Sequence, residues 1–191
     1  MKTSGNRILL LAAAVALAAC SSQESAVVKS AGDTVVVHKR PQQVSPLRRK
    51  VVSQLEKKNY RQAIALMYGK NREGLEKEYI LAINGLLEAG NDAFSSGDYS
   101  AAARAFKMVL KAYPGEPSLR DRVNLDPKRI RALLEACLDR MMEQGLEEYR
   151  RGRLENAIQK WKVLLAISPG HREAKKALDT ATVQLENMKN M

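Results

Sequence analysis

Cysteine, histidine and aromatic residues are scarce in this chain of 191 residues. Two cysteines are too few for a disulfide-dense scaffold or a four-thiolate zinc site. The two histidines, His38 and His171, exclude most histidine-rich metal chemistry. Aromatic residues make up 5% of the chain, which argues against a stacking platform for single-stranded nucleic acid. We therefore expect no bound metal and no non-covalent cofactor.

Motifs that carry catalysis are also missing. Gly69 and Lys70 lack the upstream glycines of a phosphate-binding loop, and neither a His-Glu-x-x-His nor a Gly-x-Ser-x-Gly motif occurs. The pair Glu147 and Glu148 is predicted to be solvated on an exposed helix face. We expect His171 to be a helix cap or a loop residue rather than a base. The sequence therefore contains none of these catalytic motifs.

Positive charge is in excess. Thirty-two Lys and Arg stand against 21 Asp and Glu, a net charge of +11, which favours an anionic partner such as headgroups or an acidic protein face. The excess is largest in residues 39–61, where Glu56 is the single acidic residue. One interpretation is a solvated, flexible basic stretch. The other is contact with anionic lipid, cell-wall polymer or an acidic partner.

The N-terminus has the pattern of an export signal. Lys2 and Arg7 precede an unbroken apolar run, 8–19, which is too short to span ~30 Å of hydrocarbon as a helix. The run ends in Leu17-Ala18-Ala19-Cys20, which resembles a bacterial lipobox. An ordinary signal peptide that happens to end in cysteine is the alternative.

The lipobox resemblance implies a membrane-anchored protein. In that family Leu17, Ala18 and Ala19 form the signal peptidase motif, residues 1–19 are removed, and Cys20 carries covalent lipid as the new N-terminus. Two or three acyl chains anchor a protein durably. Ser21, in place of an Asp, is typical of routing to the outer membrane, facing the periplasm. A periplasmic protein rarely meets DNA, so we expect no nucleic-acid partner.

Residues 20–45 are predicted to form a lipidated, flexible tether, because their composition is mixed and rich in small and polar residues. The β-branched run 34–37 has no second strand to pair with. Cys137 would then be the single unmodified thiol. Its spacing places it on the apolar face of a helix, which favours a buried structural cysteine over a redox role.

Beyond Ser45, apolar residues recur at helical spacing. The clearest series follows Asp126 and Pro127, which are typical of an N-cap and a first helical residue. Its members are Ile130, Leu133, Leu134, Cys137, Leu138, Met141 and Met142. No segment alternates as paired strands do. The predicted fold class is all-α.

One part of the sequence recurs further along the chain at a constant offset and without a gap, so that Gly90, for example, recurs as Gly145. The identical pairs are Gly90 and Gly145, Gly97 and Gly152, Ala102 and Ala157, Leu110 and Leu165, and Pro114-Gly115 and Pro169-Gly170. Phe106 and Trp161 form a conservative aromatic pair. Each copy predicts a hairpin of two helices joined by a short connection.

Each repeated residue has an expected role in that hairpin. A glycine within the first helix, Gly90 or Gly145, costs ~1 kcal/mol in helix propensity, so close approach of a second helix must favour it. We expect Ala102 and Ala157 to face these glycines. Phe106 and Trp161 are expected to fill the space between neighbouring hairpins. Gly97 and Gly152 suit a left-handed helix end, and Pro114 and Pro169 stop the second helix.

The stretches 90–102 and 145–157 resemble tetratricopeptide repeats (TPR) in their spacing of glycine, alanine, aromatic and proline. Leu86 and Met141 replace the usual aromatic, and the usual period of about 34 residues is exceeded. We attribute the excess to first helices extended over 75–95 and 126–151 and to a longer loop around Pro117. The resemblance implies a TPR-like αα-hairpin solenoid over 46–191, with a degenerate unit 46–74, repeats 75–116 and 126–170, and a capping helix 172–188.

The TPR resemblance also implies a function, since such repeats are usually scaffolds that bind peptides in a groove lined by first helices. The family has no intrinsic enzymatic activity, so the resemblance implies that this protein is not an enzyme. Carried over by alignment, the groove positions are Asn84, Leu87, Asn91 and Phe94 in one repeat and Asp139, Met142, Leu146, Tyr149 and Arg150 in the other. The expected protein is an outer-membrane-anchored adaptor that binds a protein partner in envelope, pilus or secretion assembly. The alternative is an envelope structural protein that binds anionic lipid or cell-wall polymer through residues 39–61.

Overall fold

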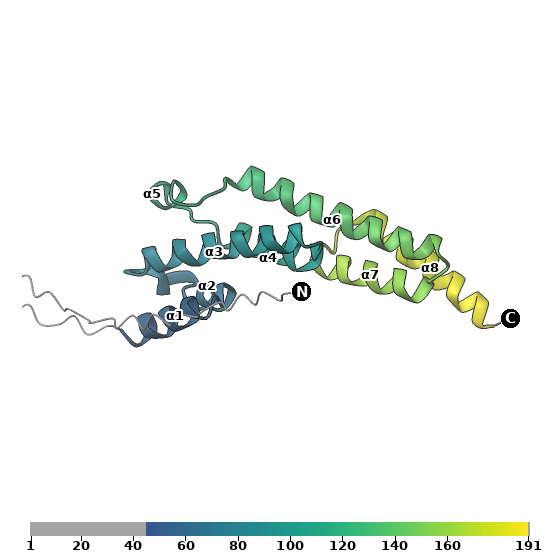
Figure 1. Cartoon of the computed structure of the whole chain (residues 1–191), viewed down its shortest axis with the longest axis horizontal. Coiled ribbons are helices and arrows are strands. Elements are labelled where there is room, and N and C mark those ends of the chain that lie inside the picture. The colour runs from purple at the N-terminus through teal and green to yellow at the C-terminus, as the bar shows by residue number, and fades with distance from the viewer. Residues whose placement is uncertain (1–44, 191) are drawn as a thin grey trace, which may run out of the picture. The chain divides into compact units, whose positions relative to one another are not determined.

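The computed structural model describes residues 45–190, and every regular element in that part of the chain is helical (Figure 1). This confirms the all-α prediction for the described residues. The helices are α1 (Pro46–Glu56), α2 (Tyr60–Leu66), the 3-10 turn η1 (Gly69–Arg72), α3 (Glu76–Ser95), α4 (Tyr99–Ala112), α5 (Pro117–Arg120), α6 (Pro127–Arg150), α7 (Leu154–Ile167) and α8 (Arg172–Lys189).

Each long helix packs on the one before it and the one after it. The order of packing follows the chain from α1 through α4, then passes to α6, α7 and α8 (Figure 1). The short α5 lies in the connection between α4 and α6. Both α3 and α4, and α6 and α7, are joined by three residues, so each pair forms an antiparallel hairpin. The described part is therefore a row of stacked helical hairpins.

Aspartate side chains cap the N-terminal ends of α4 and α6. The Asp126 carboxylate accepts hydrogen bonds from the backbone N–H groups of Lys128 (2.9 Å) and Arg129 (3.0 Å), and Pro127 is the first helical residue. Asp98 accepts from the N–H of Ala101 at 3.0 Å, and this bond lowers the pKa of the Asp98 carboxyl. These carboxylates thus accept hydrogen bonds from backbone N–H groups that have no partner within the first turn of the helix.

Replacing Asp126 with alanine is expected to lower the free energy of unfolding by about 1 kcal/mol, because two N–H groups at the start of α6 lose their acceptor. Thermal unfolding followed by circular dichroism measures this change. Asp126→Asn keeps an acceptor at the same place and is expected to retain most of the stability. Equal losses in the two variants would contradict the capping role.

The turns within both hairpins depend on a left-handed glycine. Gly97 has a φ of 82° and Gly152 a φ of 74°, the conformation expected from their place in the sequence. A Cβ atom at either position would meet nothing within 4 Å. Backbone conformation, and not crowding, therefore selects glycine there. Each second helix ends two residues before its proline, at Ala112 before Pro114 and at Ile167 before Pro169.

The glycines inside the first helices face a different residue from the one predicted. A Cβ on Gly145 would lie 2.2 Å from Nε1 of Trp161, and a Cβ on Gly90 would lie 2.8 Å from Cε1 of Phe106. The alanines Ala102 and Ala157 are fully buried, but they are not the nearest neighbours of these glycines. The large rings thus lie against the helical glycine of their own hairpin, at the place where Ala102 and Ala157 were predicted.

The first helix pair is short but well packed. Ala63 and Met67 of the α2 region are buried, and α2 packs on α3. At this contact a Cβ on Gly85 would lie 2.4 Å from the Tyr60 ring, so a third glycine accepts an aromatic neighbour. This contact was not predicted from the sequence, because Gly85 lies outside the repeated positions.

The predicted signal peptide, the motif Leu17-Ala18-Ala19, the lipidation site Cys20 and the tether up to residue 44 lie outside the described residues. In the part that is described, no helix has both the length and the apolar character that crossing a bilayer requires.

Candidate protein-binding surface

The predicted groove positions on α3 divide into buried and exposed residues. Leu87 is 2% exposed and belongs to the hydrophobic core, so its predicted contact with a ligand is wrong. Asn91 is exposed. Phe94 is half-buried and packs edge-to-face on Tyr99, with 5.4 Å between ring centroids. Of these three residues, only Asn91 presents an exposed polar side chain.

Asn84 is also among the predicted groove positions, but both ends of its amide are used internally. Its Nδ2 donates to the carbonyl of Arg122 at 2.9 Å, and its Oδ1 accepts from the N–H of Asn124 at 3.0 Å. These bonds fix the loop that runs from α5 to α6. Asn84 is therefore a structural residue, and the prediction that it binds a ligand is corrected. The long inter-repeat loop supplies the backbone groups that occupy it.

The positions on α6 show a similar division. Asp139 and Arg150 are exposed, whereas Met142 and Leu146 are half-buried and pack on the core. The hydroxyl of Tyr149 donates to Oε1 of Gln184 on α8 at 2.7 Å, and its ring lies 6.0 Å from that of Trp161. Helix α8 therefore contacts the C-terminal end of α6, which was predicted to line the groove.

The helices that carry the two sets of groove positions, α3 and α6, make little direct contact with each other in the described part of the chain. Within the described residues α4 packs extensively on both α3 and α6. The exposed members, Asn91 on one helix and Asp139 with Arg150 on the other, are the predicted groove residues that remain available to a partner.

The acidic pair on α6 forms ion pairs and is not simply solvated as predicted. Glu147 pairs with Arg151, and Oε2 of Glu148 lies 2.7 Å from Nε of Arg153. Asn156 also donates to Glu148 at 3.0 Å. The bond from Asn156, followed by that from Arg153, lowers the pKa of the Glu148 carboxyl. This arrangement closes the α6–α7 turn.

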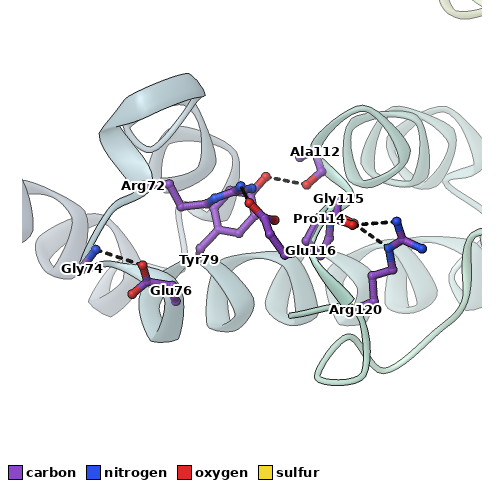
Figure 2. A network of polar contacts seen from close by, with 9 residues as sticks. All are labelled: Arg72, Gly74, Glu76, Tyr79, Ala112, Pro114, Gly115, Glu116 and Arg120. Atoms are coloured by element: carbon purple, nitrogen blue, oxygen red, sulfur yellow. Dashed lines mark hydrogen bonds and ion pairs between the residues drawn. The ribbon is translucent and has the colours of Figure 1, made fainter. Parts of the chain in front are cut away.

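Figure 2 shows a polar network where η1 meets the end of α4. The Arg72 guanidinium pairs with Glu116 and lies 5.0 Å from the centroid of the Tyr79 ring. The Tyr79 hydroxyl donates to the carbonyl of Ala112, and burial raises the pKa of that hydroxyl. Arg120 donates to two backbone carbonyls of the preceding loop at 3.3 and 2.6 Å. These polar groups are used in contacts within the protein, and the network joins η1, α3 and the end of α4.

The one described histidine acts as a cap. Nδ1 of His171 accepts from the N–H of Ala174 at 3.2 Å, at the start of α8. Among residues 45–190 no group of three or more His, Cys, Asp or Glu side chains is placed to hold a metal ion.

Cys137 is fully buried, and burial raises the pKa of its thiol to about 11. We expect the folded protein to resist thiol-directed alkylation at pH 8, and denaturant to expose the thiol. Mass spectrometry of the alkylated protein measures the difference. Because the folded pKa lies above the unfolded value of 9.0, the folded state favours the protonated thiol. Its stabilising effect on the free energy of unfolding is therefore complete below pH 9 and is lost as pH rises through 11. Rapid labelling of the native thiol would contradict the assigned burial.

A basic surface that was not predicted from the sequence lies where α2, α4 and α7 meet. We call it the basic depression: a shallow hollow of about 390 Å³ lined by Arg61, Arg104, Lys107, Met108, Lys111, Ala166 and Ile167. No carboxylate of the described residues lines it. Arg61 and Arg104 lie far apart in sequence, so only the fold joins them. The spacing of residues 104, 107 and 111 on one helix face was the available signal.

Comparisons with protein-family models, with curated proteins and with solved structures found no match to this chain.

Proposed function

We propose that this protein is a lipid-anchored scaffold of the bacterial envelope, whose TPR-like hairpins bind a protein partner. The observation that carries the proposal is the repeated hairpin. Its two copies share a left-handed glycine in a three-residue turn and a helical glycine against an aromatic ring, at matching positions of the sequence repeat. Stacked hairpins of this kind present extended surfaces that suit binding better than catalysis.

The helix lengths support an extended version of the repeat. The first helices α3 and α6 have 20 and 24 residues, while the second helices α4 and α7 have 14 each. The long first helices, together with the connection that contains α5, explain why the period exceeds the usual value of about 34 residues. Helix α8 packs on α7 and acts as the C-terminal cap.

The motif ending in Cys20 supports anchoring by covalent lipid at the outer membrane, facing the periplasm. Labelling cells with an alkyne fatty acid tests this part. We expect labelled protein from the natural chain and none from Cys20→Ala. An unlabelled natural chain would refute the anchor.

Site-specific photocrosslinking tests the binding surface. A photoreactive residue at exposed Asn91 on α3 or Asp139 on α6 is expected to give adducts with one and the same protein. The matched control is exposed Glu155 on the second helix α7, where no adduct is expected. Adducts of equal yield from all three positions, or from none, would contradict a scaffold that binds through its first helices.

One observation favours the second candidate, an envelope structural protein that binds anionic lipid or cell-wall polymer. Arg49, Lys50, Lys57 and Lys58 of the basic segment 39–61 are exposed. Arg48 is an exception: its Nη2 lies 2.7 Å from Oε1 of Glu78, so its charge is already paired.

A further inference from the structure

We propose that the basic depression is the surface through which the helical domain lies against anionic phospholipid headgroups. The inference rests on the lipid-anchoring part of the proposed function and names the surface that faces the bilayer. It combines Arg61 of the basic segment 39–61 with residues of α4 and α7 that lie outside that segment.

In the described part of the chain the cations of the basic depression form no salt bridges, although Arg104 lies close enough to Asp98 to contribute to the lowered pKa of that carboxyl. Arg61, Arg104, Lys107 and Lys111 contribute four cations, and none of them forms an ion pair within the described residues. Nζ of Lys107 donates to the carbonyl of Ile167 at the end of α7. The Coulomb attraction of such a cluster for a phosphate is stronger than that of cations interspersed with carboxylates.

The neighbourhood of the depression also has the apolar and aromatic character of a membrane-contacting surface. The half-buried Met108 contributes apolar lining beside the cations, whereas Ile167 is 4% exposed and belongs to the core. Tyr68 is 57% exposed, and Nζ of Lys111 lies 5.6 Å from the centroid of its ring. Exposed tyrosine is favoured at headgroup level, since its ring is apolar and its hydroxyl is polar. This combination fits a bilayer surface better than it fits an acidic peptide alone.

The predicted lipid anchor at Cys20 favours a bilayer as the binding partner of the basic depression. Between Cys20 and the start of α1 the chain consists of residues 21–45. At most ~3.6 Å per residue, this segment holds α1 within ~90 Å of the bilayer. A lipid surface is thus present at high effective concentration, and even weak contact with it is populated. An acidic protein would have to find the same depression by diffusion.

The test uses the chain from residue 20 onward with Cys20→Ser, so that no acyl chain contributes to binding. Sedimentation with phosphatidylethanolamine vesicles, with and without phosphatidylglycerol, measures the partition coefficient. The variant Arg104→Gln/Lys107→Gln/Lys111→Gln is compared with Lys175→Gln/Lys176→Gln/Lys189→Gln on α8. The control loses the same charge at exposed positions that lie among Glu173, Asp179 and Glu186.

We expect binding that requires phosphatidylglycerol and weakens as salt rises. The α4 variant is expected to lose on the order of 100-fold in partition coefficient, about fivefold for each cation, and the α8 control less than about fivefold. Circular dichroism checks that both variants stay folded. Equal losses in both, or no dependence on phosphatidylglycerol, would overturn the proposal. Such a result leaves the anchor itself standing, because fatty-acid labelling tests that separately.

Discussion

Replacing Trp161 with alanine is expected to lower the free energy of unfolding by about 3–5 kcal/mol, the largest effect of any single change we propose. Trp161 is the only tryptophan, is 1% exposed, and fills the space over Gly145 inside the α6–α7 hairpin. Its removal leaves a cavity that two rigid helices cannot fully close. Folded domains are stable by about 5–15 kcal/mol, so the variant is expected to be largely unfolded or to melt far lower. Thermal unfolding by circular dichroism measures the change.

Two further variants define what the tryptophan contributes. Leu81→Ala removes a large side chain that is 58% exposed, and is expected to change stability by less than about 1 kcal/mol. Trp161→Phe keeps an aromatic ring. It also removes Nε1, which is buried with no hydrogen-bond partner among the described residues and so carries a desolvation cost of about 1–3 kcal/mol. We expect Trp161→Phe to cost much less than Trp161→Ala. Equal losses would show that packing of the ring is not the cause.

The helices themselves could be predicted from the sequence, because their signals are local. Apolar spacing, the cap at Asp126 and the left-handed glycines at 97 and 152 all act within a few residues of the element that they define. The internal repeat then indicates which helices pair as hairpins. Each of these features depends on neighbours in the chain, so the sequence contains them directly.

Contacts between helices could not be predicted in the same way. Which side chain faces Gly145 depends on the rotation and the crossing of two helices, and the small Ala157 was predicted where the structure has Trp161. The predictions that Asn84 and Leu87 contact a ligand were wrong for related reasons. One is occupied by the backbone of an unusually long connection, and the other faces the core once α3 is packed. The basic depression likewise exists only after α2, α4 and α7 meet.

The pairing of helical glycine with an aromatic ring leads to the second large expected effect. Gly145→Ala places a Cβ 2.2 Å from Nε1 of Trp161, well inside van der Waals contact. Alanine is favoured over glycine within a helix by about 1 kcal/mol, but overpacking a buried rigid ring costs about 1–3 kcal/mol or more. The clash is expected to win, with a net loss of about 1–2 kcal/mol. Gly170→Ala, where a Cβ meets nothing within 4 Å, is the control and is expected to be neutral or slightly stabilising.

A double-mutant cycle tests whether the ring is the cause of the loss in Gly145→Ala. Phenylalanine lacks the indole nitrogen that the new methyl group would strike, and the other hairpin already pairs Gly90 with Phe106, at a longer 2.8 Å to the position of a Cβ. In the Trp161→Phe background we therefore expect Gly145→Ala to cost less, with a coupling free energy of about 0.5–3 kcal/mol. If Gly145→Ala costs the same in both backgrounds, the glycine is required for another reason. Agreement with the cycle would explain why a residue that weakens a helix occurs at the same place in both repeats: it makes room for the ring that joins the two helices of each hairpin.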